Sequence, residues 1–189
     1  MKNTLKSVLT LALVAGLGFV ANAQILTANE NATATATVLT DISVVKDLDI
    51  AFGNVQPGTV PTLDPTTFGS SAAVGATAAI GKFTVEGTPT ASVLVTFTTA
   101  VTMSNGEAIP DQLIFTPVVS RTALTADTDG ATPILNNGTY VINASGVGTV
   151  AGTDHFFVGG TLTEDGTAAI GPAANGLYTG TFTLTVAYN

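Results

Sequence analysis

GLYTGTFTLTVAYN, residues 176–189, ends the chain with a regular alternation of side chains. From Tyr178 onward, apolar or aromatic residues alternate with threonine or alanine, and one glycine interrupts the apolar series. A period of two is typical of a β-strand that buries one face. We therefore predict a terminal strand that directs Phe182, Leu184 and Val186 into a core.

Similar patterns recur along most of the chain. Threonine and valine, which favour strands, are abundant, and glycine and proline separate the patterned segments. No segment beyond residue 23 has the period of a useful helix. Eight or nine strands with turns between them predict an all-β fold, an immunoglobulin-like antiparallel β-sandwich. The expected strands are 32–39, 42–55 (one bent strand or two short ones), 80–87, 91–103, 112–120, 138–146, 154–165 and the terminal strand.

Proline-containing segments give three further predictions. The tract 56–79 is rich in proline and small residues, which indicates a mobile loop or a short hidden strand near Thr67–Phe68. Residues 88–90, Thr-Pro-Thr, have the spacing of a hairpin turn. Pro117 lies inside a strand pattern and cannot donate a backbone hydrogen bond, which favours an edge strand or a bulge.

The first 23 residues have the anatomy of a secretory signal peptide. Lys2 and Lys6 precede a largely apolar stretch, Val8–Val20, and Ala21-Asn22-Ala23 provides a small-residue cleavage site. The apolar stretch is shorter than the roughly 20 residues that a membrane-spanning helix requires. We expect residues 1–23 to direct export to the periplasm, cell surface or medium, and residues 24–189 to form a single sandwich domain without a membrane span.

The composition of residues 24–189 excludes several classes of partner. Thirteen acidic residues face only three basic ones, a formal charge of −10, whereas nucleic-acid binding depends on lysine and arginine. An anionic membrane surface would repel such a chain. The chain has no cysteine, so we expect a fold held by its core and its sheet hydrogen bonds, without disulfides.

Residues with catalytic or metal-binding chemistry are sparse. His155 is the one histidine, and its neighbour Asp154 would point to the opposite face of a strand, so it could not orient the imidazole as a catalytic base. Asp127 and Asp129 lie in a DTDG turn whose glycine comes too early for an EF-hand calcium loop. Zinc would lack cysteine and a second histidine. We expect no enzymatic activity, no cofactor and no specific metal site, with surface calcium at such acidic turns left open.

Three segments together resemble a known family. FGNV near residue 52, FFVGGTLT at 156–163 and YTGTFTLTVAYN at the end are similar to the secreted bacterial domain of unknown function 4402, over essentially the whole chain from about Ala32. That resemblance implies an exported β-sandwich and no activity or ligand. The terminal strand is also similar to the last strand of chaperone–usher pilin subunits, with Gly176 fourteenth from the end and Tyr188 next to last.

The pilin resemblance implies that the terminal strand, with Gly176, Phe182, Leu184, Val186 and Tyr188, is an assembly element. Its partners would be a periplasmic chaperone or a neighbouring copy, bound by strand pairing. The N-terminal segment, however, offers Ile25 and Leu26 and then mostly alanine and threonine, and the cysteine pair of many pilins is missing. The alternative is a terminal strand that only closes a complete sandwich.

Two hypotheses on function follow. In the first, the protein is an exported bacterial cell-surface structural or adhesive protein, pilin-like and self-associating by strand pairing. In the second, it is a monomeric secreted module that binds a carbohydrate or a protein. The absence of tryptophan speaks against a carbohydrate site, which usually presents exposed aromatic side chains.

Overall fold

The computed structural model describes residues 33–67, 70, 71, 73–107, 112–122, 131–144, 151–164, 170 and 176–189. Residues 38–189 form one compact unit, and these described parts contain strands and no helix. No helix in the described ranges is long and apolar enough to cross a membrane. The strands are β1 (Ser43–Leu48), β2 (Thr62–Leu63), β3 (Gly81–Gly87), β4 (Ser92–Phe97), β5 (Val101–Ser104), β6 (Gln112–Thr122), β7 (Thr132–Pro133), β8 (Gly138–Val141), β9 (Gly152–Thr163) and β10 (Leu184–Tyr188).

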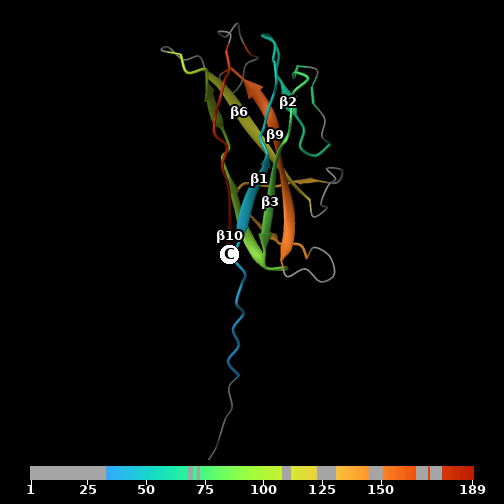
Figure 1. Ribbon diagram of the computed structural model, residues 1–189, viewed down its shortest axis with the longest axis vertical. Helices are drawn as coiled ribbons and strands as arrows, with labels where there is room; N and C mark the ends of the chain where they lie inside the picture. Colours follow the sequence, from blue (N-terminus) through green and yellow to red (C-terminus); the bar gives the residue numbers. More distant parts are fainter. Residues whose placement is uncertain are drawn as a thin grey trace, which may run out of the picture. The chain divides into compact units, whose positions relative to one another are not determined.

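All strand pairs are antiparallel and form two sheets (Figure 1). The larger sheet has the order β1-β3-β9-β6-β5, with β2 and β7 added to β9 and β6. The smaller sheet has the order β10-β4-β8. The prediction of an all-β antiparallel sandwich is confirmed in these terms. The described part has ten strands, two of them only two residues long, where the sequence predicted eight or nine.

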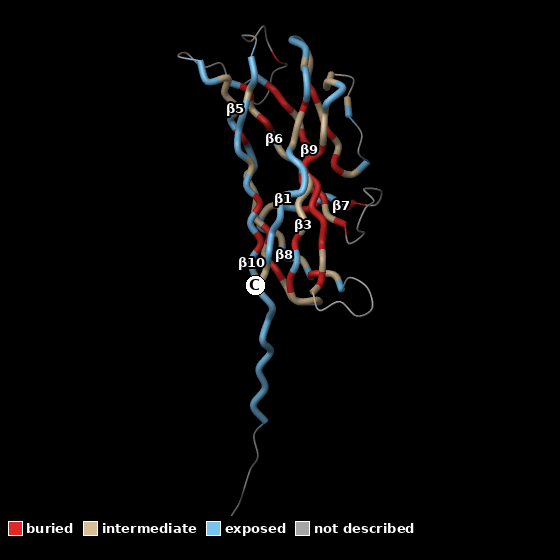
Figure 2. The backbone as a smooth tube through the Cα atoms, in the orientation of Figure 1, coloured by how far each residue is buried: buried red, intermediate tan, exposed pale blue. Residues whose placement is uncertain are grey.

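The core lies between the two sheets and follows the alternation of side chains. Val93 and Val95 of β4 and Leu184 and Val186 of β10 are buried, and the alternating residues of β10, Thr185 and Ala187, are exposed. The strands of the larger sheet contribute most of the rest, together with residues of the connecting segments such as Phe52 and Ile142. Figure 2 shows burial concentrated on β9 and its neighbours. The main buried apolar side chains of that sheet are Val85, Val101, Leu113, Phe115, Val119, Phe156, Val158 and Leu162.

The expected strand 91–103 changes sheets halfway. β4 pairs with β10 and β8 in the smaller sheet, and β5 pairs with β6 in the larger one. The turn at residues 88–90 likewise connects β3 in the larger sheet to β4 in the smaller sheet, so the predicted hairpin is wrong. Thr90 adopts a positive φ of 63° at this crossing. β3 and β4 both bury apolar residues, and the short spacing between them does not show whether they belong to the same sheet or to different sheets.

β9 lies at the centre of the larger sheet and shows why two glycines interrupt it. A side chain at Gly159 would lie 2.3 Å from the Leu63 carbonyl oxygen, and one at Gly160 would lie 2.1 Å from that of Thr116. Gly160 also has a φ of 136°, which favours glycine. The GG pair therefore lets the backbones of β2 and β6 approach β9 closely.

Pro117 belongs to β6, which lies between β9 and β5, so the predicted edge strand is wrong as stated. The register with β9 passes through the Pro117–Gly160 pair without a shift, and there is no bulge. On the other side of β6, however, pairing with β5 extends only as far as Phe115, and pairing with β7 starts at Ser120. Pro117 therefore lies in a stretch in which β6 pairs with one neighbour only. Its missing N–H donor is tolerated there for the same reason as on an edge strand.

Within residues 33–79, the described residues form fewer and shorter strands than their sequence pattern predicted. The expected strand 32–39 is wrong for its described residues, 33–39, which form no strand because they have no partner strand in the described chain. The expected strand 42–55 is β1 followed by a single bridge between Ala51 and Ala79. In the tract 56–79, the short strand is β2 at Thr62–Leu63; the predicted position near Thr67–Phe68 extends beyond the described residues at Phe68.

Candidate functional site

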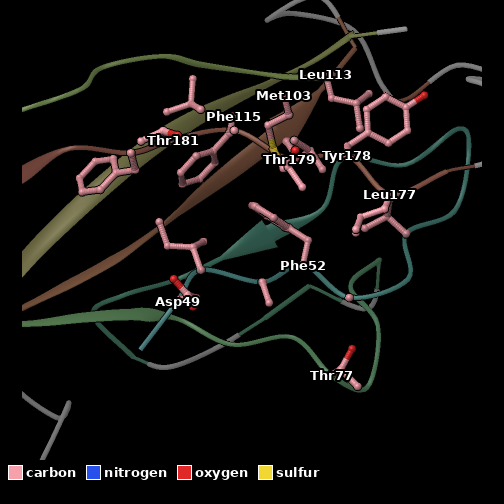
Figure 3. Close-up of a pocket in the computed structure, with 18 of the residues that line it drawn as sticks. Asp49, Phe52, Thr77, Met103, Leu113, Phe115, Leu177, Tyr178, Thr179 and Thr181 are labelled. Atoms are coloured by element: carbon pink, nitrogen blue, oxygen red, sulfur yellow. The ribbon is translucent and has the colours of Figure 1, made fainter. Parts of the chain in front are cut away.

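A groove opens between the chain that follows β1 and the chain that precedes β10. It has a volume of about 940 Å³. One wall is formed by the end of β1 and residues 48–55, and the other by Gly176–Phe182 (Figure 3). These walls extend the edge strands of the two sheets, β1 and β10, so the groove is a seam at which the sandwich is open.

The first wall presents an unpaired backbone edge. Lys82 pairs with Leu48, and Ala79 exchanges two backbone hydrogen bonds with Ala51, at 2.9 and 2.7 Å. In an antiparallel ladder, successive residues direct their backbone groups to opposite sides. Since Ala51 is bonded to Ala79, the N–H and C=O groups of Leu48 and Ile50 point away from β3 and toward the open seam. All six residues of β1 are exposed, as its pale colour in Figure 2 shows.

The second wall has the same property. Thr179 exchanges two backbone hydrogen bonds of 3.0 Å with Ser104, and the Thr183 carbonyl accepts one from Thr98. By the same alternation, the backbone groups of Gly180 and Phe182 point away from β4 and β5. No backbone hydrogen bond joins residues 48–55 to residues 176–182, both of which are fully described. Two strand edges therefore line the seam without pairing with one another.

The floor of the groove is apolar core. Phe52 and Phe115 meet edge to face with their ring centroids 5.5 Å apart, and Met103, Leu113 and Leu162 line the same floor. Phe182 packs against Phe83 and Phe97, at centroid distances of 5.9 and 6.4 Å. The charged lining residues are Lys46 and Asp49, an exposed pair with Nζ and Oδ1 2.5 Å apart. An occupant would thus cover apolar core and need little charge.

Comparison with known proteins assigns the chain to a family. The family model described as "Domain of unknown function (DUF4402)" matches residues 42–188, which is most of the chain. The chain belongs to the DUF4402 family. Both walls of the groove lie inside the matched DUF4402 domain, whereas residues 33–41 precede it. A search of curated proteins gave no match.

The terminal-strand residues predicted from the sequence divide between the core and the groove of the DUF4402 domain. Leu184 and Val186 are buried in the core, and Phe182 lies partly buried on the groove lining. Gly176 is exposed at the groove. Tyr188 is partly buried beyond the groove, where its hydroxyl accepts a hydrogen bond from the Thr88 N–H and donates one to the Thr40 carbonyl, each 2.7 Å.

The opposite wall of the groove was not among the residues predicted from the sequence. Leu48, Ile50 and Phe52 were included in an expected strand, but nothing in their pattern indicated that the strand would lie at an open edge. The one signal in the sequence was the position of this strand near the start of the domain. A strand that has a neighbour on one side only is an edge strand with unpaired backbone groups. Sequence alone does not reveal which strands become neighbours.

The polar residues singled out in the sequence form no catalytic arrangement among the described positions. Asp154 and His155 point to opposite faces of β9, with Asp154 bonded to Arg121 and His155 to Thr84. Within the described residues, no cluster of three or more His, Asp or Glu side chains is placed to hold a metal ion. Asp127 and Asp129 lie outside the described residues.

His155 is buried in β9 and takes part in a short polar chain. The Thr84 hydroxyl donates to Asp47 Oδ2 at 2.6 Å, so its oxygen is free to accept from His155 Nδ1 at 3.0 Å. Nε2 is buried without a hydrogen-bond partner among the described atoms. Burial lowers the pKa of His155 from its ordinary value of 6.5, with a further contribution from Lys82, while Asp47 and Asp154 oppose the shift. The imidazole is therefore held in its neutral form.

This neutral histidine predicts a pH-dependent stability. The folded pKa lies below the unfolded one, so below pH 6.5 the unfolded chain binds more protons and the free energy of unfolding falls. One such group changes stability by at most about 1.4 kcal/mol per pH unit. Urea unfolding at a series of pH values should show this loss for the wild type and a flatter profile for His155→Asn. An unchanged slope in the variant would assign the dependence to other groups.

Proposed function

We propose that this protein is an exported structural or adhesive component of a bacterial cell surface that works by accepting an extended strand in the groove. The supporting observation is the pair of unpaired strand edges, at Leu48 and Ile50 on one wall and Gly180 and Phe182 on the other, above an apolar floor. A strand laid between them would satisfy both edges by backbone hydrogen bonds and cover the floor with alternate side chains.

The order of the strands supports an immunoglobulin-like and pilin-like interpretation. In an immunoglobulin sandwich, one sheet contains strands A, B, E and D and the other contains C, F and G. Here β1, β3, β9 and β6 follow the order of the first sheet, and β4 and β10 correspond to C and F. A counterpart of strand G beside β10 is missing from the described sheets. The groove occupies the side on which such a strand would lie.

Export and a non-enzymatic role are further parts of this proposal. The signal-peptide pattern of residues 1–23 and the acidic, cysteine-free composition are the features that support it. The expected exported form begins at Gln24, and intact-mass measurement of the surface or periplasmic protein checks this. A mass that includes residues 1–23 would contradict cleavage at this site.

The test of strand acceptance uses one charged substitution in the groove and one outside it. Leu48 is a 54% exposed groove residue on β1, and Val118 is a 43% exposed residue of β6 that does not line the groove. Lysine on a strand edge disfavours edge pairing. In the native bacterium, Leu48→Lys should abolish heat-labile, high-molecular-weight surface material, and Val118→Lys should retain it.

Circular dichroism of both purified variants should match the wild type, because both side chains are exposed. Assembly of Leu48→Lys at the wild-type level would overturn the proposal. So would a wild-type protein that is found only as a monomer on the surface of its own cells.

A further inference from the structure

We infer that the strand received by the groove is residues 33–39 of a second copy of this chain, an inference that rests on the function proposed above. Thr33–Leu39 read TATATVL, and every one of these residues is exposed and outside any strand. Val38 is 91% exposed. The segment thus has strand-forming composition and no strand partner of its own.

The chemistry of the segment fits the groove. It contains no charge and no proline, so each residue can donate and accept a backbone hydrogen bond in a ladder. Ala34, Ala36 and Val38 share one face, and the threonines share the other. At about 3.3 Å per residue, the seven residues extend over roughly 23 Å.

The small side chains complement a floor that is already made of large ones. Phe52, Phe115 and Met103 form the base of the groove, so the face with Ala34, Ala36 and Val38 can lie against it. The threonine face then points to water, as on an antiparallel strand with one solvated side. The backbone of the segment would pair with Ile50 on one wall and Gly180 on the other.

The attachment of the chain at Thr40 favours a second copy over the chain's own segment. Tyr188 Oη donates to the Thr40 carbonyl, and the Thr40 N–H donates to Thr88 Oγ1, both at 2.7 Å. The groove lining starts only at Lys46, so residues 33–39 could reach it only by reversing direction next to this fixed point. Of the residue types that dominate tight reversals (glycine, proline, asparagine, aspartate and serine), residues 32–42 contain only Asp41.

Disulfide cross-linking tests this directly, because the chain has no cysteine of its own. One full mature chain carries Thr35→Cys, on the water-facing side of the segment, and another carries Thr181→Cys on the exposed groove wall. Mixed under mild oxidation, they should give a disulfide-linked heterodimer on a non-reducing gel. The control replaces Thr181→Cys by Thr116→Cys, at an exposed β6 position away from the groove. The yield of heterodimer with Thr181→Cys should be at least about ten times the yield with this control, the ratio that a tenfold difference in affinity would give.

A chain with both Thr35→Cys and Thr181→Cys should form a ladder of linked copies. A monomer closed by an internal disulfide, or a heterodimer yield no higher than the Thr116→Cys control, would overturn the inference. Two further substitutions, made in the cysteine-carrying chains, test which face of residues 33–39 lies against the floor of the groove. A charge added by Val38→Asp should abolish the cross-link, whereas Thr37→Asp, on the opposite face, should retain it.

The outcomes separate this inference from the proposed function. If Leu48→Lys abolishes surface assembly but the cysteine pair does not cross-link, the groove receives a strand from another source, and only the inference about residues 33–39 fails. If Leu48→Lys assembles normally and no cross-link forms, both fail.

Discussion

Replacing Asp154 by alanine should destabilise the domain by about 3–5 kcal/mol, the cost of breaking a buried ion pair from one side. The Asp154 side chain is 1% exposed and lies 2.7 Å from Arg121 Nη2, whose side chain is 15% exposed. Asn143 Nδ2 donates to the other carboxylate oxygen at 2.6 Å. Arg121 also donates to the Val141 carbonyl and lies 5.6 Å from the centre of the Tyr140 ring. Without Asp154, the guanidinium loses its counter-ion within the protein.

Urea unfolding of the purified mature protein measures this effect. The matched control is Asp49→Ala, which removes the exposed pair with Lys46 and should cost no more than about 1 kcal/mol. The two substitutions delete the same carboxylate chemistry and differ in burial. Equal losses of stability would show that burial of the Arg121–Asp154 pair does not have the importance given to it here.

The second large effect is expected at Phe156, at the centre of the core. Its side chain is 1% exposed, and in the register of the sheet it lies between Phe83 of β3 and Arg121 of β6. Phe156→Ala should lower the free energy of unfolding by about 3–5 kcal/mol, because it removes a large apolar side chain and leaves a cavity.

The control for Phe156→Ala is Leu177→Ala, at an apolar residue that is 81% exposed on the groove wall. A surface substitution of this kind should stay within about 0.5 kcal/mol of the wild type. Urea unfolding of both variants checks the contrast. A loss below about 1 kcal/mol for Phe156→Ala would contradict the position of the core, since buried phenylalanines cost several times more.

The sequence predicted the parts of the fold that local pattern determines. The alternation in residues 178–188 placed Leu184 and Val186 correctly on the buried face of β10, because side-chain direction follows from strand geometry alone. The GG pair in β9 was recognised only as part of a family resemblance. Its physical reason, the close approach of Leu63 and Thr116, depends on strands that are distant in sequence.

Features that depend on pairing between distant segments could not be predicted. The expected strand 91–103 divides between two sheets, and the turn at residues 88–90 crosses between them, although both looked like local hairpin elements. The pairing of Arg121 with Asp154 has the same origin, since 33 residues separate them. The groove follows from where β1 and β10 lie in the two sheets, which neither strand's own sequence specifies.

The most direct test of strand acceptance is amide hydrogen exchange on the two groove walls. In peptides covering residues 48–55 and 176–182, the amides that point into the seam should exchange rapidly in the isolated protein and become protected in the assembled material proposed for the surface of the native cells. These amides belong to Leu48, Ile50, Gly180 and Phe182. Peptides from the already paired β9 should exchange equally slowly in both states. Protection that appears on both walls together is the result expected for a strand inserted between them. Unchanged exchange on both walls in the surface material would contradict it.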